Sequence, residues 1–100
     1  MKHFAQGQTF HISDVDELNA STAPAFRDEI RAALKPEYTA VDIDLSDTKF
    51  IDSSGLGALI AIQKTMAMRQ GMVRIVNPTK TVMQILELTR LHRVLEIVRR

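Results

Sequence analysis

The chain has 100 residues, of which 45% are hydrophobic and 25% charged, so its size and composition predict one globular domain over residues 1–100 with a modest core. A net charge of +1, with basic and acidic residues interleaved, argues against a nucleic-acid-binding surface. Because cysteine is absent, disulfides and cysteine-based metal or redox sites are excluded, and the composition is compatible with a cytoplasmic location.

The N-terminal region predicts one or two short strands between residues 2 and 18, where apolar residues are interrupted by the turn-forming Ser13 and Asp14. A first helix is expected next, with Ser21 or Thr22 as its cap and Pro24 in its first turn. Apolar residues recur at helical spacing until Pro36 stops this helix: Phe26, Ile30, Ala33 and Leu34.

Residues 40–45 form the next predicted strand, because Val41, Ile43 and Leu45 alternate with Asp42 and Asp44. Such alternation predicts that only the face with the apolar side chains is buried. A loop over residues 46–52 is expected to follow the strand.

A second helix is predicted from Ser53 to about Gln70, with Gly71 as its left-handed C-terminal stop. Its expected inward face consists of Leu56, Leu59, Ile60, the stem of Gln63 or Lys64, and Ala67. The longest apolar run, Leu56 to Ile62, has seven residues with Gly57 included, whereas a membrane span needs roughly 20. We therefore expect no association with a membrane.

Residues 72–76 are predicted to form another strand, and Asn77-Pro78-Thr79 to open a third helix. The residues expected to point inward from this helix are Val82, Ile85 and Leu86, with Leu88 as a further candidate. Residues 94–98 suit a last short strand. This alternation of strands and helices predicts an α/β fold with a mostly parallel sheet.

The most informative segment runs from Asp44 to Gly57, where a predicted strand and loop lead into two adjacent serines, Ser53 and Ser54, at a helix start. Backbone N–H groups at a helix start lack intrahelical partners and carry the positive end of the helix dipole, so they accommodate a hydroxyl or a phosphate. No base, metal-ligand cluster or phosphate-cradling glycine loop accompanies the serines. The segment therefore indicates a modifiable surface serine and no catalytic site.

Other interpretations of this segment stay open at this point. Ser53 or Ser54 could be the N-cap of the helix, and Asp52 could serve either as a cap or as a partner contact. Gly55 and Gly57 predict close approach of the helix to a strand or to a partner. A hydrolase is disfavoured, because the Gly-x-Ser-x-Gly pattern is missing, and the three histidines, His3, His11 and His92, show neither a link to the serines nor metal-ligand spacing.

The segment Asp44-Leu45-Ser46, followed after a spacer by Phe50-Ile51-Asp52-Ser53-Ser54-Gly55-Leu56-Gly57, closely resembles the signature of the STAS domain, the fold of bacterial anti-sigma factor antagonists. The resemblance covers nearly the whole chain, including Glu17-Leu18-Asn19 before the first helix and Asn77-Pro78 before the third. It implies a single STAS-like α/β domain with a small, mixed, mostly parallel sheet and helices packed mainly on one face.

The resemblance also implies a partner switch. Ser53, the first serine of the motif, would be phosphorylated by an anti-sigma factor that is also a serine kinase, with Ser54 as the alternative acceptor. The unphosphorylated antagonist would bind its anti-sigma factor and free the sigma factor, and a metal-dependent serine phosphatase would restore the complex after phosphorylation. The implied protein is a non-enzymatic regulator without cofactor or metal. We expect it to be monomeric when free, because no apolar stripe is left over.

The implied partner surface comprises Asn19, Thr48, Lys49, Asp52, Ser53, Ser54, Gly55 and Gly57. Asn19 stands where many relatives carry an acidic residue, so the contact made there is expected to differ. Thr48 and Lys49 are expected at the rim of the surface, and Phe50 is expected to be buried beneath the loop. As an alternative function, some single STAS domains bind the ATPase of a lipid ABC transporter, but the intact motif from Asp52 to Gly55 favours the antagonist.

Overall fold

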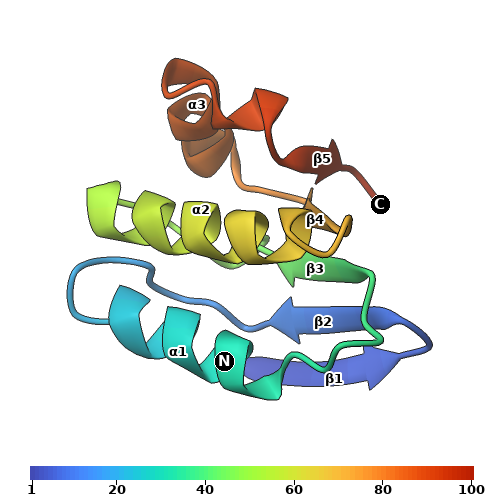
Figure 1. Ribbon diagram of the computed structural model, residues 1–100. Coiled ribbons are helices and arrows are strands. Elements are labelled where there is room, and N and C mark those ends of the chain that lie inside the picture. The colour runs from blue at the N-terminus through green and yellow to red at the C-terminus, as the bar shows by residue number, and fades with distance from the viewer.

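The five strands of the sheet lie side by side in the order in which they occur in the sequence (Figure 1). The computed structural model describes residues 1–100 and has five strands: β1 (Lys2–Gln6), β2 (Thr9–Ser13), β3 (Ala40–Asp44), β4 (Met72–Val76) and β5 (Glu96–Val98). β1 is antiparallel to β2, whereas β2, β3, β4 and β5 are parallel to one another. The prediction of a mixed, mostly parallel sheet is confirmed.

Three helices connect the parallel strands: α1 (Ala23–Ala33), α2 (Ser53–Ala67) and α3 (Lys80–Leu88), and a short 3-10 helix (Leu91–Arg93) precedes β5. Neighbouring parallel strands require such crossover connections, because the chain must return to the opposite end of the sheet before the next strand can begin. Helices α1 and α2 pack against each other on one face of the sheet, as expected (Figure 1). None of the helices has the length and apolar character that crossing a bilayer requires.

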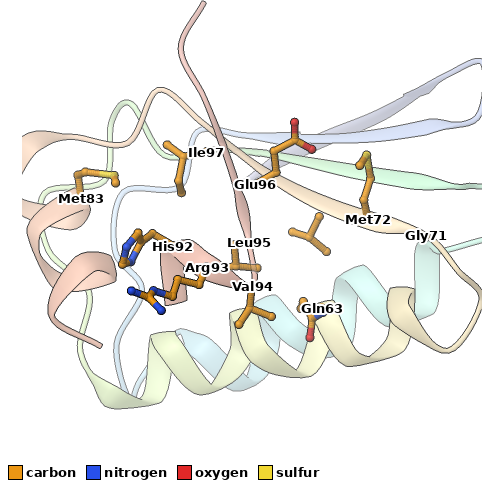
Figure 2. A pocket seen from close by; sticks show the side chains of 11 residues that line it. Gln63, Gly71, Met72, Met83, His92, Arg93, Val94, Leu95, Glu96 and Ile97 are labelled. Carbon is orange, nitrogen blue, oxygen red and sulfur yellow. The ribbon is translucent and has the colours of Figure 1, made fainter. Parts of the chain in front are cut away.

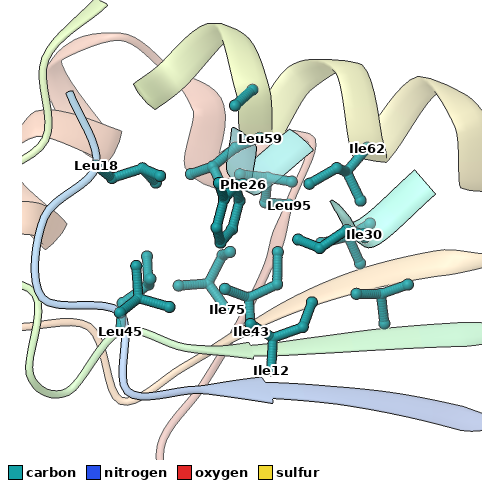
Figure 3. Close-up of a cluster of buried hydrophobic side chains, with 14 of the residues drawn as sticks. Ile12, Leu18, Phe26, Ile30, Ile43, Leu45, Leu59, Ile62, Ile75 and Leu95 are labelled. Carbon is teal, nitrogen blue, oxygen red and sulfur yellow. The ribbon is translucent and has the colours of Figure 1, made fainter. Parts of the chain in front are cut away.

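One cluster of 21 buried hydrophobic residues fills the space between this face of the sheet and the helices (Figure 3). Ile12, Ile43 and Ile75 are register partners on β2, β3 and β4, so their side chains form a row across the sheet. Phe26 and Ile30 reach this row from α1, which confirms the predicted inward face of that helix. Burying a side chain of this size contributes roughly 1.5–3 kcal/mol before losses of conformational entropy.

The inward face of α2 differs from the predicted one. Its buried residues are Gly55, Ala58, Leu59, Ile62 and Met66. Of the predicted set only Leu59 is buried, while Leu56, Ile60 and Gln63 are half-buried and Lys64 and Ala67 are exposed. The prediction was wrong because α2 carries apolar residues on nearly every side, so their spacing does not single out one face.

The end of α2 also differs from the prediction. The helix ends at Ala67, and the residue with left-handed backbone is Gln70, at a φ of 58°, in place of Gly71. Gly71 is required for another reason, because a Cβ atom there would lie 2.7 Å from the carbonyl oxygen of Thr39. Glycine is therefore required at position 71 because there is no room for a side chain beside the start of β3. A left-handed turn conformation is not the reason.

Helix α3 begins where the sequence predicts, after the N-cap Thr79, whose hydroxyl accepts a hydrogen bond from the backbone N–H of Val82. Val82 and Leu86 are buried, and Ile85 is half-buried. Leu88, a further candidate for the core, is 83% exposed. It lies two residues beyond Leu86, which places its side chain on the opposite side of the helix.

Asp42 contradicts the expectation of a solvent-facing aspartate on β3. Its side chain is only 3% exposed, although it lies on the face of the sheet opposite the core cluster. Arg74 and Arg100 donate hydrogen bonds to its two carboxylate oxygens over 2.5 and 2.9 Å, and His11 Nδ1 lies 3.8 Å away. The Phe4 ring stacks on His11 at 4.8 Å. Side chains from the neighbouring strands and from the C-terminal residue therefore bury this carboxylate.

Two opposing effects act on the pKa of the Asp42 carboxyl. Burial by itself would raise the pKa of the Asp42 carboxyl, but hydrogen bonds from Arg74 and Arg100, together with their positive charges, hold this pKa below its ordinary value of 3.8. A carboxyl whose pKa is lower in the folded state stabilises the fold at any pH above the unfolded-state value. That contribution is lost as the pH falls through the folded-state pKa.

We predict that Asp42→Asn lowers the free energy of unfolding at neutral pH by about 1–3 kcal/mol, because two arginines lose a charged acceptor. The difference between wild type and variant is expected to shrink as the pH falls from about 5 to about 2, where wild-type Asp42 is itself protonated. Urea unfolding across this range measures the difference, with Asp47→Asn at an exposed position as the control. A difference that stays constant with pH would contradict the assigned role of the Asp42 charge.

Candidate functional site

The loop from Leu45 to Asp52 joins β3 to α2 at the carboxyl end of the parallel strands, where open α/β sheets place their binding sites. Three of its side chains are buried and fix its path: Leu45, Thr48 and Ile51. The Thr48 hydroxyl donates to the carbonyl oxygen of Val15, and the Thr48 carbonyl accepts from the Thr79 hydroxyl over 2.9 Å. The loop is thereby tied to the segments that precede α1 and α3.

Two predicted positions in this loop are reversed in the structure. Thr48, expected at the rim of a partner surface, is fully buried, because its short hydroxyl side chain satisfies the Val15 carbonyl inside the protein. Phe50, expected beneath the loop, is 59% exposed. Ile51 points inward in its place. Lys49 is exposed, as predicted.

Asp52 is the N-cap of α2 and has extended backbone torsions of φ −103° and ψ −173°. Its Oδ1 atom accepts a hydrogen bond from the Gly55 N–H over 3.0 Å, and its Oδ2 atom accepts from the Ala20 N–H over 3.1 Å. The backbone N–H of Asp52 also donates to the Leu18 carbonyl over 3.3 Å. One carboxylate therefore caps α2 and holds the segment that leads into α1.

The capping role of Asp52 decides the position of the two serines. Ser53 and Ser54 are the first two residues of α2 and both are exposed, so the interpretation of either serine as the N-cap is wrong. Neither hydroxyl makes a hydrogen bond within the protein, in contrast to the carboxylate of Asp52. The helix start therefore does not depend on either hydroxyl.

The two glycines of the motif have different surroundings. Gly55 is buried, and a Cβ atom there would lie 2.3 Å from the carbonyl oxygen of Leu18 and 2.7 Å from a side-chain carbon of Ile51. Gly57 is exposed, and a Cβ atom there would meet nothing within 4 Å. Gly55 therefore serves close packing inside the domain, whereas Gly57 leaves open space on its surface.

Asn19 lies next to this site and organises the start of α1. Its side-chain oxygen accepts hydrogen bonds from the backbone N–H groups of Ser21 and Thr22 over 2.9 and 3.2 Å. Thr22 occupies the N-cap position of α1, one of the two predicted, but its hydroxyl does not cap the helix and instead donates to the Glu17 carbonyl over 3.0 Å. Asn19 supplies the acceptor oxygen that an acidic residue would supply at this position, but without its charge.

A hollow of about 330 Å³ opens between α1 and α2 beside the serines. Its lining consists of Ala20, Ala23, Pro24, Arg27, Ser54, Gly57 and Ala58. Neither Arg27 nor this hollow is predictable from the sequence, because their position depends on how two helices from separate parts of the chain pack. Ser54 and Gly57 share the hollow, whereas Ser53 lies outside it.

A wider hollow of about 650 Å³ lies on the other side of α2, between this helix and the C-terminal segment (Figure 2). Its lining includes Gln63, Met72, Met83 and Val94, and none of the motif residues takes part. The three histidines are also engaged away from the serines: His3 with Glu29, His11 with Asp42, and His92 with the Leu86 carbonyl. The motif residues Asp52, Ser53, Ser54 and Gly55 all lie at the start of α2, away from this wider hollow and from the histidines.

Residues 4–98 match the protein family described as "Mlab, STAS domain". The chain belongs to the STAS domain family. A Thermotoga maritima protein, assigned provisionally as an anti-sigma factor antagonist, is 34% identical to this STAS domain over 85 residues, or 81% of this chain and 73% of the relative. The anti-sigma-B factor antagonist of Listeria monocytogenes is 27% identical over 81 residues, with coverage of 81% and 71%.

Solved structures share the fold of this STAS domain. The anti-sigma factor antagonist SpoIIAA in its unphosphorylated form has a TM-score of 0.80 at 18% identity, over 99% of this chain and 86% of that one. The phosphorylated form of SpoIIAA, a Bacillus cell fate determinant, has a TM-score of 0.74 at 17% identity, over 99% and 89%. The family resemblance and the fold class predicted from the sequence are confirmed.

We predict opposite effects of alanine at the two motif glycines. Gly55→Ala is expected to lower the free energy of unfolding by about 1–3 kcal/mol, because the added methyl group overlaps a backbone carbonyl that cannot move freely. Gly57→Ala is expected to raise it by up to about 1 kcal/mol, because alanine favours the helix and meets open space. Urea unfolding of both variants provides the measurement. Equal effects at the two positions would contradict the assigned packing of α2.

Proposed function

We propose that this STAS domain is an anti-sigma factor antagonist, which binds an anti-sigma factor and is released when Ser53 is phosphorylated. The observation that carries the proposal is the position of Ser53 as the exposed first residue of α2, with a free hydroxyl beside a carboxylate that already caps the helix. The relatives named as anti-sigma factor antagonists support the same function.

The position of Ser53 suits a switch that acts without refolding. A phosphate adds about −1.5 to −2 charges at pH 7, and the dipole and free N–H groups of a helix start favour such a charge. Ile51 and Leu59 belong to the buried core cluster, whereas Ser53 is exposed, so a phosphate on its hydroxyl would not enter the core. The added charge and bulk would act on the partner, where repulsion in a partly desolvated interface costs several kcal/mol.

The exposed residues around Ser53 supply a contact surface for the partner. Phe50 is a large aromatic side chain that is more than half exposed, and Lys49 and Gly57 are exposed nearby in the chain. Exposed aromatic side chains are frequent anchors of protein interfaces. We infer that Phe50 contacts the anti-sigma factor, with Lys49 at the rim and Gly57 allowing close approach. Thr48 and Gly55 are buried and do not contact the partner directly. They hold the loop and α2 in the positions that expose the contact residues.

The reactions at Ser53 belong to the partners. A kinase activity of the anti-sigma factor would transfer the γ-phosphoryl group of ATP to the Ser53 oxygen, with loss of the hydroxyl proton and release of ADP. A metal-dependent serine phosphatase would hydrolyse the ester and return the free hydroxyl. In this proposal the STAS domain itself is a cytoplasmic substrate and binding protein, with no catalytic role.

We predict that Ser53→Ala abolishes phosphorylation by the cognate kinase and changes the free energy of unfolding by less than about 0.5 kcal/mol, because Asp52 still caps α2. Intact-mass spectrometry after incubation with the kinase and ATP measures phosphate incorporation, and Ser54→Ala is the matched control. Undiminished incorporation in the Ser53 variant would place the site elsewhere, with Ser54 as the first candidate.

We predict that phosphorylation of Ser53 weakens binding to the anti-sigma factor by well over tenfold, and that Ser53→Asp has a smaller effect of the same sign because its charge is smaller. Thermal unfolding is expected to change little in both forms. Calorimetric titration of the purified anti-sigma factor against the three proteins measures the affinities. Equal affinities for unmodified and phosphorylated protein would exclude the switch, and tight binding to the ATPase of a lipid transporter instead would favour the alternative function.

A further inference from the structure

The hollow between α1 and α2 is lined by one charged side chain. Arg27 is the only charged residue in its lining, and Ser54 contributes a free hydroxyl from the opposite helix. The remaining lining is small or apolar: Ala20, Ala23, Pro24, Gly57 and Ala58. The volume of about 330 Å³ exceeds that of a single side chain, and a Cβ atom added at Gly57 would meet nothing within 4 Å, so the hollow is wide at this position.

Arg27 has no strong partner of its own within the protein. Its Nε atom lies 3.0 Å from Asp28, the next residue in the chain, and the two side chains are 39% and 66% exposed. An ion pair with this exposure contributes about 0–1 kcal/mol, so a better acceptor can replace it at little cost. The Arg27 guanidinium is therefore available to a ligand that enters the hollow.

Both polar side chains that line the hollow can donate hydrogen bonds. The Arg27 guanidinium has donors only, the Ser54 hydroxyl can donate as well as accept, and Ser54 lies in the first turn of α2, at the positive end of the helix dipole. The nearby carboxylate of Asp52 does not line the hollow, and each of its oxygens already accepts a backbone N–H. A carboxylate is the complementary group, and arginine binds carboxylates through two parallel hydrogen bonds.

We propose that this hollow receives an acidic side chain of the anti-sigma factor, an aspartate or glutamate that pairs with Arg27 and approaches the Ser54 hydroxyl. The inference rests on the proposed function and names the chemistry of its partner contact. Such a contact would also make the complex sensitive to phosphorylation. A phosphate on Ser53, at the start of α2, carries the same sign of charge as the incoming carboxylate and would repel it.

The test is calorimetric titration of the purified anti-sigma factor against wild type and Arg27→Gln. We expect the variant to lose about tenfold or more in affinity while its melting temperature stays the same. Arg31→Gln, at an exposed position one turn further along α1, is the matched control and is expected to bind like wild type. Gly57→Leu, which fills the hollow, is expected to lose affinity, whereas Gly57→Ala leaves most of the space open.

Phosphorylation supplies the second readout. If Arg27 and the phosphate act on the same partner carboxylate, phosphorylation of Ser53 is expected to reduce the affinity of Arg27→Gln by a smaller factor than that of wild type. Wild-type affinity of Arg27→Gln would overturn the inference and leave the proposed function standing. Failure of the anti-sigma factor to bind wild-type protein would instead overturn the proposed function and the inference together.

Discussion

The site depends on the two oxygens of the Asp52 carboxylate. One accepts the Gly55 N–H and starts α2, and the other accepts the Ala20 N–H across 32 positions of sequence. A single side chain thus fixes the first turn of one helix relative to the approach to another. Because Asp52 takes the capping role, the serines that follow it keep free hydroxyls on the surface. A serine at the cap position would have its hydroxyl engaged by the backbone, and modification would then compete with the helix.

Two neighbouring contacts keep the region around Asp52 in place. Gly55 lies so close to Leu18 that no side chain fits between them, which brings α2 against the segment before α1. Thr48 ties the preceding loop to Val15 on one side and to Thr79 on the other. The loop is therefore anchored from inside at Thr48 and Ile51, while the intervening Lys49 and Phe50 face solvent. The exposed residues between these anchors have a defined position, which limits the entropy lost when a partner binds.

The sequence predicts the elements of the fold well, because alternation and helical spacing are local properties. It does not predict the inward face of α2, where apolar residues occur on nearly every side and the sheet decides which of them is buried. Asp42 shows the same limit on β3. The Asp42 side chain is buried by Arg74 on a neighbouring strand and by Arg100 at the end of the chain. The alternation of apolar and polar residues along β3 does not predict the position of either arginine.

The same distinction holds for the site. The serines and Asp52 could be located from the signature, because their roles follow from a helix start. The predicted positions of Thr48 and Phe50 are wrong, because the choice of which loop side chain points inward depends on the Val15 carbonyl from another segment. Arg27 carries no local signal at all, and only the packing of α1 against α2 brings it beside Ser54. Groups from separate segments thus meet at the surface that we propose as the partner contact. A charge added to one serine then changes the electrostatics of a surface built by two helices, and the hydrophobic core need not respond.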